Sequence, residues 1–292
     1  MRAHDAYDEL EGERSGTLRK ILDYYDGSPR LYRYALGHRT EASDVMTLGL
    51  AFHSLTLEPD TFDACYAVWK GAPVKSGKSK GQISTARRGQ EWLAFEAENA
   101  HKTILRMQDV GKVSRMARAV REHPAASELL ANAEVEFTTQ WVDVATGIKC
   151  KALSDAYDPT TRTLIELKST ATISRQRLAA QVVRMGWDFQ LAHHRAGCIA
   201  NGRPVDQVCI IAVESGGIHD VRVYRIPIAT DLVLGDIKRR RALALLAKCR
   251  AENRWPGQSD DIEDLNLPPW ADPDHGTDDE NDMIIIEDEA DA

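Results

Sequence analysis

Hydrophobic residues recur at the three-to-four-residue spacing of helices through most of the first 131 positions. Helices are therefore predicted over 15–36 with a break at 27–29, over 42–57 with an end at Pro59, and over 90–131 with a break near 122–124. The intervening segment 70–90 is rich in glycine, serine and lysine, which predicts a flexible loop. This part of the chain is expected to be mainly helical.

The pattern changes at Glu134, where β-branched and aromatic residues become frequent. It predicts strands over 134–141, 148–156 and 163–168, a helix over 174–197, strands over 208–213 and 221–226, and a helix over 231–252. The order β-β-β-α-β-β-α is typical of a mixed sheet with helices packed on it, an α/β (α+β) fold. We expect one domain over 1–271, with a mainly helical part (1–131) and a sheet core (132–258), followed by an acidic, disordered tail (272–292).

The composition is that of an ordinary globular protein, since 43% of the 292 residues are hydrophobic and 28% are charged. No apolar run approaches the roughly 20 residues that span a bilayer, and residues 1–13 lack the apolar stretch of a secretory signal. The five cysteines are far apart and form no CxxC pair, which argues against a disulfide framework and a zinc ribbon. We expect a cytoplasmic protein without a membrane partner.

The charge is unevenly distributed along the chain. Its formal value is −8, but residues 259–292 hold 14 Asp and Glu and no Lys or Arg. The remaining 37 basic and 31 acidic residues give residues 1–258 a formal charge of +6. A mildly basic body is compatible with a nucleic-acid partner, whereas the acidic end is a solvated segment, an interaction tail or a mimic of nucleic-acid charge.

Basic residues gather in the loop 70–90, where no acidic residue interrupts them. Such clusters neutralise phosphates without reading a base sequence, although a solvated protein face has the same composition. The residues predicted to contact DNA are Lys75, Lys78, Lys80, Arg87 and Arg88 in this loop, with Arg175 and Arg177 at the start of a later helix.

Three charged residues on two adjacent predicted strands are the candidate chemical site. Glu166 and Lys168 are two apart and share one face of their strand. If the turn is formed by residues 159–162, Asp155 lies opposite Glu166, and opposed residues have Cβ atoms about 4.5–5.5 Å apart. Two carboxylates this close favour a hard divalent cation between them, which suits hydrolysis of a phosphodiester. The alternative is an exposed, charged face of a hairpin.

These residues also resemble a known signature. Leu153-Ser-Asp155 followed by Leu164-Ile-Glu166-Leu-Lys168 is similar to the PD-(D/E)XK nuclease motif. Further segments in chain order resemble RecE-type (exonuclease VIII-like) nucleases of that superfamily: 48–59 with Gly49, His53 and Glu58-Pro59; 136–151 with Glu136, Trp141, Thr146-Gly147 and Cys150-Lys151; Gln190; 208–214; Trp255-Pro-Gly257; and Leu267-Pro-Pro-Trp270.

The resemblance implies a restriction-endonuclease-like core and an exonuclease that requires Mg²⁺ or Mn²⁺ and digests double-stranded DNA from its ends, 5′ to 3′, in recombination or repair. The implied metal ligands are His53, Glu136, Asp155 and Glu166. Lys168 would be the catalytic lysine, and Gln190 would hold the site or the DNA. Four residues after Gln190 stands His194, where the family usually has tyrosine. An altered DNA contact is expected there.

The resemblance further implies a phage-type recombination setting, a single-strand annealing protein as partner and a homo-oligomer. Two other functions stay open: a structure-specific or single-strand endonuclease with the same metal chemistry, and a catalytically silent protein that binds DNA ends.

Overall fold

The computed structural model describes residues 3–38, 43–268 and 271. The chain divides into two compact units, Met1–Gln258 and Ser259–Ala292, and all elements described below belong to the first. The predicted acidic tail, 272–292, lies outside the described residues. The predicted domain over 1–271 stays a prediction.

Nine strands and eleven α-helices are described, with short 3₁₀ or π turns between some of them. The strands are β1 (Tyr66–Trp69), β2 (Ala72–Pro73), β3 (Ile83–Ser84), β4 (Thr103–Arg106), β5 (Glu134–Val142), β6 (Lys149–Asp158), β7 (Thr163–Thr170), β8 (Gln207–Glu214) and β9 (Val221–Arg225). The helices are α1 (Ala3–Glu9), α2 (Ser15–Leu18), α3 (Pro29–Gly37), α4 (Asp44–Leu57), α5 (Phe62–Cys65), α6 (Gln90–Glu98), α7 (Met107–Glu122), α8 (Pro124–Leu130), α9 (Arg175–Arg184), α10 (Trp187–Ala200) and α11 (Val233–Glu252).

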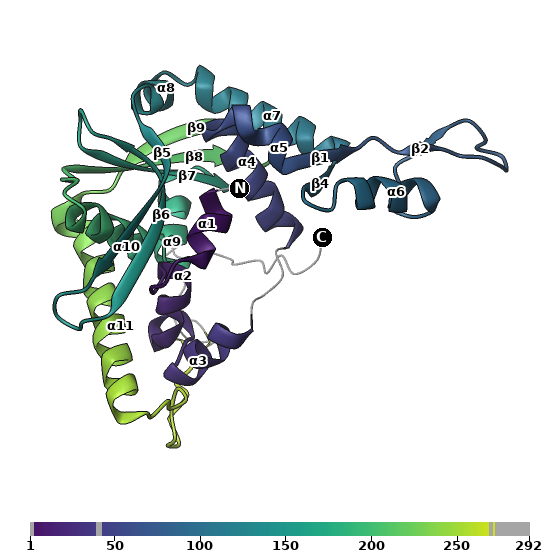
Figure 1. Ribbon diagram of the computed structural model, residues 1–292. Helices are drawn as coiled ribbons and strands as arrows, with labels where there is room; N and C mark the ends of the chain where they lie inside the picture. Colours follow the sequence, from purple (N-terminus) through teal and green to yellow (C-terminus); the bar gives the residue numbers. More distant parts are fainter. Residues whose placement is uncertain (1–2, 39–42, 269–270, 272–292) are drawn as a thin grey trace. The chain divides into compact units, whose positions relative to one another are not determined.

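The centre of the first unit is a five-stranded sheet with the order β5-β6-β7-β8-β9 (Figure 1). All neighbouring strands are antiparallel except β7 and β8, which are parallel because α9 and α10 form the crossover between them. The sheet is therefore mixed, and helices flank it, as the α/β (α+β) prediction requires.

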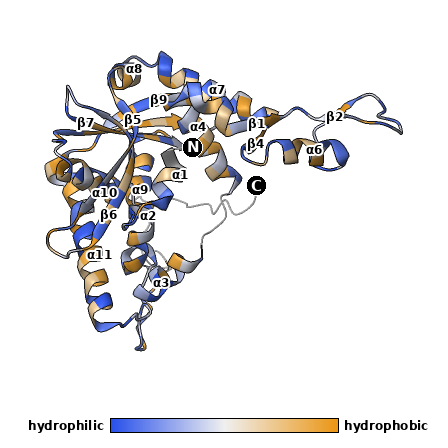
Figure 2. Ribbon diagram, in the orientation of Figure 1, coloured by the Kyte–Doolittle hydropathy of each residue, from blue (hydrophilic) through white to orange (hydrophobic). Residues whose placement is uncertain are grey.

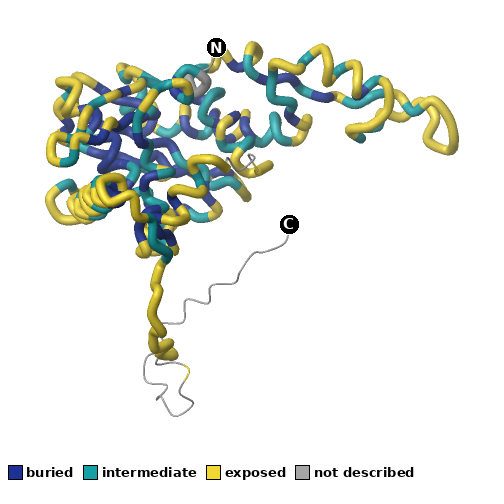
Figure 3. Tube along the Cα trace, turned by 60° about the horizontal axis from the view of Figure 1, so that its bottom comes forward, coloured by how far each residue is buried: buried dark blue, intermediate teal, exposed yellow. Residues whose placement is uncertain are grey.

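Helices cover both faces of the sheet, because alternate residues of its strands point to opposite sides. On one face, Ile165 and Ile211 pack with Phe52 of α4 and Met116 of α7. On the other face, Leu164 and Ile210 pack with residues of α9 and α10. Figure 3 shows the buried positions gathered in this sheet-containing part of the chain.

A third apolar cluster joins the N-terminal helices to the C-terminal helix. Leu18 and Tyr32 pack there with Leu243 and Leu246 of α11 and Phe189 of α10. Figure 2 shows hydrophobic and hydrophilic residues alternating around α11, which buries one face and exposes the other. No described helix is long and apolar enough to cross a membrane.

Most predicted elements occur with small shifts in their ends. The predicted breaks near 27–29 and 122–124 separate real elements, and Pro124 begins α8. The single helix predicted over 174–197 is wrong, since Gly186 adopts a left-handed backbone (φ 67°) and separates α9 from α10. The loop 70–90 contains the β2–β3 hairpin, and the parallel pair β1–β4 was not predicted.

Candidate active site

The candidate site lies where β6 separates from β7. Pairing between these strands follows the predicted register, with Asp158 opposite Thr163 and Ala156 opposite Ile165, and it ends there. One residue further, Asp155 reaches into the gap and its Oδ2 accepts a hydrogen bond from the backbone N–H of Leu167 at 2.7 Å. The carboxylate thus takes the place of a backbone hydrogen bond between the two strands and is fixed between them.

Glu136 interrupts the pairing on the other side of β6. Its neighbours Val135 and Phe137 pair with Ala156 and Ser154, whereas Glu136 itself has a left-handed backbone with φ 47°. This conformation is costly for a residue with a Cβ atom and is frequent at functional sites. Burial, followed by the charge of Asp155, raises the pKa of Glu136 to about 8.

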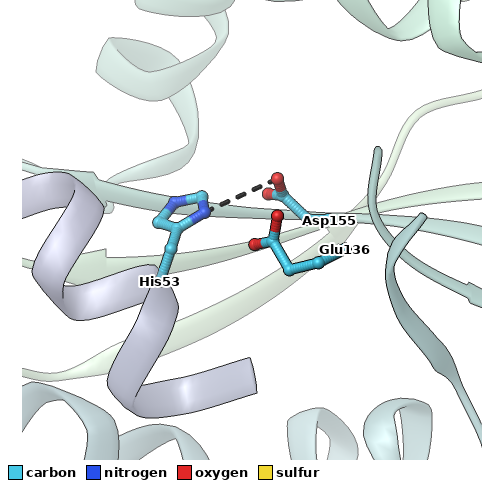
Figure 4. Close-up of side chains that lie close together, drawn as sticks. All are labelled: His53, Glu136 and Asp155. Atoms are coloured by element: carbon cyan, nitrogen blue, oxygen red, sulfur yellow. Dashed lines mark ion pairs between the residues drawn. The ribbon is translucent and has the colours of Figure 1, made fainter. Parts of the chain in front are cut away.

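Helix α4 adds an imidazole to these two carboxylates. Ser43 caps the N-terminus of α4 by accepting a hydrogen bond from the N–H of Met46, and the buried Phe52 anchors the helix in the core. The next residue, His53, places its Nδ1 3.5 Å from Oδ1 of Asp155 (Figure 4).

The three side chains form a group that fits a metal ion. One ligand atom from each of His53, Glu136 and Asp155 can be chosen so that all lie within 4.8 Å of one another. Removal from water opposes the ionised form of His53 and of Asp155. The carboxylate of Asp155 nevertheless raises the pKa of His53, and His53, Lys168 and the N–H of Leu167 together lower the pKa of Asp155. Carboxylate oxygens suit Mg²⁺ and Mn²⁺, and an imidazole nitrogen favours a transition metal such as Mn²⁺.

A second polar cluster surrounds Glu166 on β7. Oε1 of Glu166 accepts hydrogen bonds from Nζ of Lys168 at 2.6 Å and from Nε2 of Gln190 at 2.9 Å. Nζ of Lys168 also donates to Oε1 of Gln190 at 3.3 Å. Glu166 is 1% exposed and the Lys168 side chain 15%, which contradicts the alternative of an exposed, charged hairpin face.

The six residues predicted at the catalytic centre thus fall into two adjacent clusters. His53, Glu136 and Asp155 make up one, whereas Glu166, Lys168 and Gln190 make up the other. Glu166 is not a member of the three-residue ligand group, although its charge contributes to raising the pKa of Glu136.

One neighbour of the second cluster, Trp187, was not predicted. The ring of Trp187 lies 5.4 Å from Nζ of Lys168, a cation–π distance. Trp187 precedes Gln190 by three residues on α10, so helical spacing alone could have placed both on one face. His194, one turn after Gln190, is buried with 3% exposure, and the altered DNA contact expected at this position stays a prediction.

The predicted DNA-contacting residues are exposed but dispersed. Lys75 forms an ion pair with Glu91, and Arg87 donates a hydrogen bond to the carbonyl oxygen of Ile104 at 2.8 Å. Figure 1 draws the β2–β3 hairpin, which carries the loop lysines, away from the five-stranded sheet. Arg175 and Arg177 lie at the start of α9, which follows β7 in the chain.

The combination of mixed sheet, paired carboxylates and lysine points to one nuclease superfamily. Residues 26–268 match the model of a family described as "PDDEXK-like domain of unknown function (DUF3799)". The chain belongs to this PDDEXK-like family. It therefore has the PD-(D/E)XK nuclease fold that the motif around Asp155, Glu166 and Lys168 indicated, and divalent metals are the cofactors of PD-(D/E)XK nucleases.

One of the similar solved structures agrees with the fold of this PDDEXK-like chain. A Eubacterium rectale protein named as a candidate exonuclease is 12% identical, with a TM-score of 0.57 over 92% of this chain and 96% of that chain. A phage-related exonuclease from Haemophilus somnus 129PT is 12% identical, with a TM-score of 0.35 over 84% of this chain and 97% of that chain. No curated protein matches the sequence. At such identity the first similarity supports the fold alone, and the second carries no argument.

Proposed function

We propose that the protein is a metal-dependent exodeoxyribonuclease of the RecE type, which degrades double-stranded DNA from its ends, 5′ to 3′, in recombination or repair. The observation that carries the proposal is the convergence of His53, Glu136 and Asp155 on one potential metal position, beside the ion pair of the buried Glu166 with Lys168. The chain-wide motif resemblance supports exonuclease activity within the superfamily.

The first cluster would hold the divalent cation through the imidazole of His53 and the carboxylates of Glu136 and Asp155, with Glu166 approaching from the adjacent strand. When bound, this cation would polarise a phosphoryl oxygen and lower the pKa of an attacking water. The hydrogen bond from Leu167 N–H keeps one oxygen of Asp155 engaged, so the carboxylate is oriented before any metal binds.

Lys168 would act as a fixed positive charge. Burial disfavours its ammonium form, but the carboxylates of Glu166 and Asp155 outweigh burial and raise the pKa of Lys168. It therefore stays protonated and cannot serve as a general base at neutral pH. Its N–H groups can instead stabilise the negative charge that develops on the phosphate during cleavage.

The exposed basic residues would supply contacts to the DNA backbone. Arg175 and Arg177 follow the strand that carries Glu166 and Lys168, and Lys78 and Lys80 belong to the hairpin turn. Such contacts bind phosphates without base specificity and weaken as the salt concentration rises.

A digestion assay tests the proposal. Linear and covalently closed double-stranded DNA are incubated with Mg²⁺, Mn²⁺ or EDTA, using the wild type, Lys168→Ala, and Lys112→Ala as a matched lysine control on α7. Loss of the linear DNA alone, dependent on metal and abolished only in Lys168→Ala, is the expected result. A 5′-labelled duplex then reports polarity, because 5′ to 3′ digestion releases the label first.

The same assay separates the alternatives. Cutting of the closed circle would replace the exonuclease proposal with an endonuclease that uses the same residues. Binding of DNA without cleavage in either metal would favour a silent end-binding protein.

A further inference from the structure

Helix α10 contacts both oxygens of the Glu166 carboxylate. Gln190 Nε2 donates to Oε1 at 2.9 Å, and Nδ1 of His194 lies 3.4 Å from Oε2. These two residues are four apart and therefore lie on the same face of the helix, one turn from each other.

His194 and Glu166 face each other through two atoms, Nδ1 and Oε2, that have no hydrogen-bond partner among the described residues. Both atoms are buried, and neither makes a hydrogen bond within the described part of the chain, since even their mutual distance of 3.4 Å is long for one. The side chains are 1% and 4% exposed, so bulk water does not satisfy them. Burying a carboxylate oxygen without a donor is unfavourable, and the imidazole N–H is the group placed to donate.

We propose that His194 is a positioning residue that donates its Nδ1–H to Oε2 of Glu166 and thereby fixes the carboxylate plane. Oε1 is already engaged by Lys168 and Gln190, so without His194 the carboxylate could rotate about its last bond and carry the lysine with it. The inference rests on the proposed function, in which Glu166 serves the metal and Lys168. Its consequence is a tighter and better oriented metal site.

Isothermal titration with Mn²⁺ alone, on the full-length chain, tests this role without any nuclease readout. In His194→Asn the side-chain amide takes the place of Nδ1, whereas in His194→Gln it takes the place of Nε2. If Nδ1 makes the contact, His194→Asn binds Mn²⁺ close to the wild type, while His194→Gln and His194→Ala bind about 10–100-fold more weakly. Should the alanine variant fail to fold, the comparison of Asn with Gln decides.

The adjacent histidine provides a matched control with the opposite geometry. His193 contacts the backbone oxygens of Glu13 and Lys151 through Nε2, at 3.2 and 3.1 Å. His193→Asn should therefore lower the melting temperature while leaving Mn²⁺ affinity unchanged. If His194 were purely structural, variants of either histidine would lower the melting temperature and the Mn²⁺ affinity together.

Equal affinities for His194→Asn and His194→Gln would overturn the inference, as would wild-type affinity in all three variants. A wild type that binds Mn²⁺ but digests no DNA would refute the proposed nuclease and leave the His194 contact to be judged from the affinities. A wild type that binds no Mn²⁺ would refute both. Wild-type digestion with unchanged affinities in the variants would refute only the role of His194.

Discussion

His193 makes the stability of the fold sensitive to acid. Its Nε2 faces two backbone carbonyl oxygens, of Glu13 and Lys151, so this nitrogen carries the proton of the neutral ring. Its Nδ1 is buried and has no partner within the described part of the chain. Burial, followed by the neighbouring His194, lowers the pKa of His193 from 6.5 to about 3, because a second proton would create an unpaired buried charge.

The direction of the pH effect follows from this depressed pKa. Between pH 6.5 and about 3 the unfolded chain holds a proton on His193 that the folded chain does not, so acid favours unfolding. The stabilisation is complete above pH 6.5 and is lost progressively as the pH falls, at about 1.4 kcal/mol for each unit. Between pH 7 and pH 5 the loss is about 2 kcal/mol, a substantial part of an ordinary folding free energy of 5–15 kcal/mol.

His193→Gln is the variant that isolates this contribution. The glutamine amide can donate to the same two carbonyl oxygens but does not titrate. Urea unfolding curves at pH 7 and pH 5, followed by the fluorescence of the six tryptophans, give the free energy of unfolding of both proteins. Other titrating groups contribute equally to both, so the wild type should lose about 2 kcal/mol relative to the variant between the two pH values. An identical loss in wild type and variant would refute the assignment of a neutral, buried His193.

Three further predictions concern the site and the core. Asp155→Asn should reduce Mn²⁺ affinity and digestion of linear DNA by at least about a hundredfold; titration and gel assays check this, and unchanged binding would exclude Asp155 as a ligand. Lys168→Ala should lower kcat about 10²–10³-fold while Mn²⁺ still binds, because the ammonium group stabilises the charge that develops on the phosphate. Steady-state kinetics measure this effect, and a rise in KM alone would contradict the role. Gly197→Ala should destabilise the folded protein by about 1–3 kcal/mol in thermal melts, since its Cβ would come within 2.7 Å of the Trp141 ring. Gly111→Ala on α7 should instead stabilise the folded protein by about 0.5–1 kcal/mol. Equal shifts in the two glycine variants would count against the packing argument.

Local signals predicted the register of β6 and β7 from the turn to Ala156 and Ile165, but the predicted pairing of Asp155 with Glu166 is not formed, because the strands separate there. The turn residues between Asp158 and Thr163 fix which residues of β6 and β7 oppose each other, and alternation fixes the face of each side chain. The carboxylates of Asp155 and Glu166 were therefore expected near each other. That Asp155 turns into the gap to meet Leu167 N–H could not be predicted, because it depends on where the two strands diverge.

Contacts between distant segments were the least predictable. The short apolar runs of β1 and β4 carry no alternation, and their parallel pairing depends on packing against other elements. His53 was placed at the site by resemblance and not by its own spacing, since an isolated histidine on an apolar helix has no local signature. The burial of His194 beside Glu166 likewise follows from how α10 lies on the sheet.

The left-handed backbone of Glu136 has a consequence for the evolution and engineering of the molecule. Only glycine adopts this conformation without penalty, so Glu136→Gly should relieve part of the roughly 1–3 kcal/mol that such strain costs and should also remove a carboxylate from a crowded acidic site. Selection for thermal stability alone would thus favour losing the side chain that a metal-dependent activity needs. Stability and activity are expected to oppose each other at this residue, which makes it a position where a stabilised but inactive variant can arise in one step.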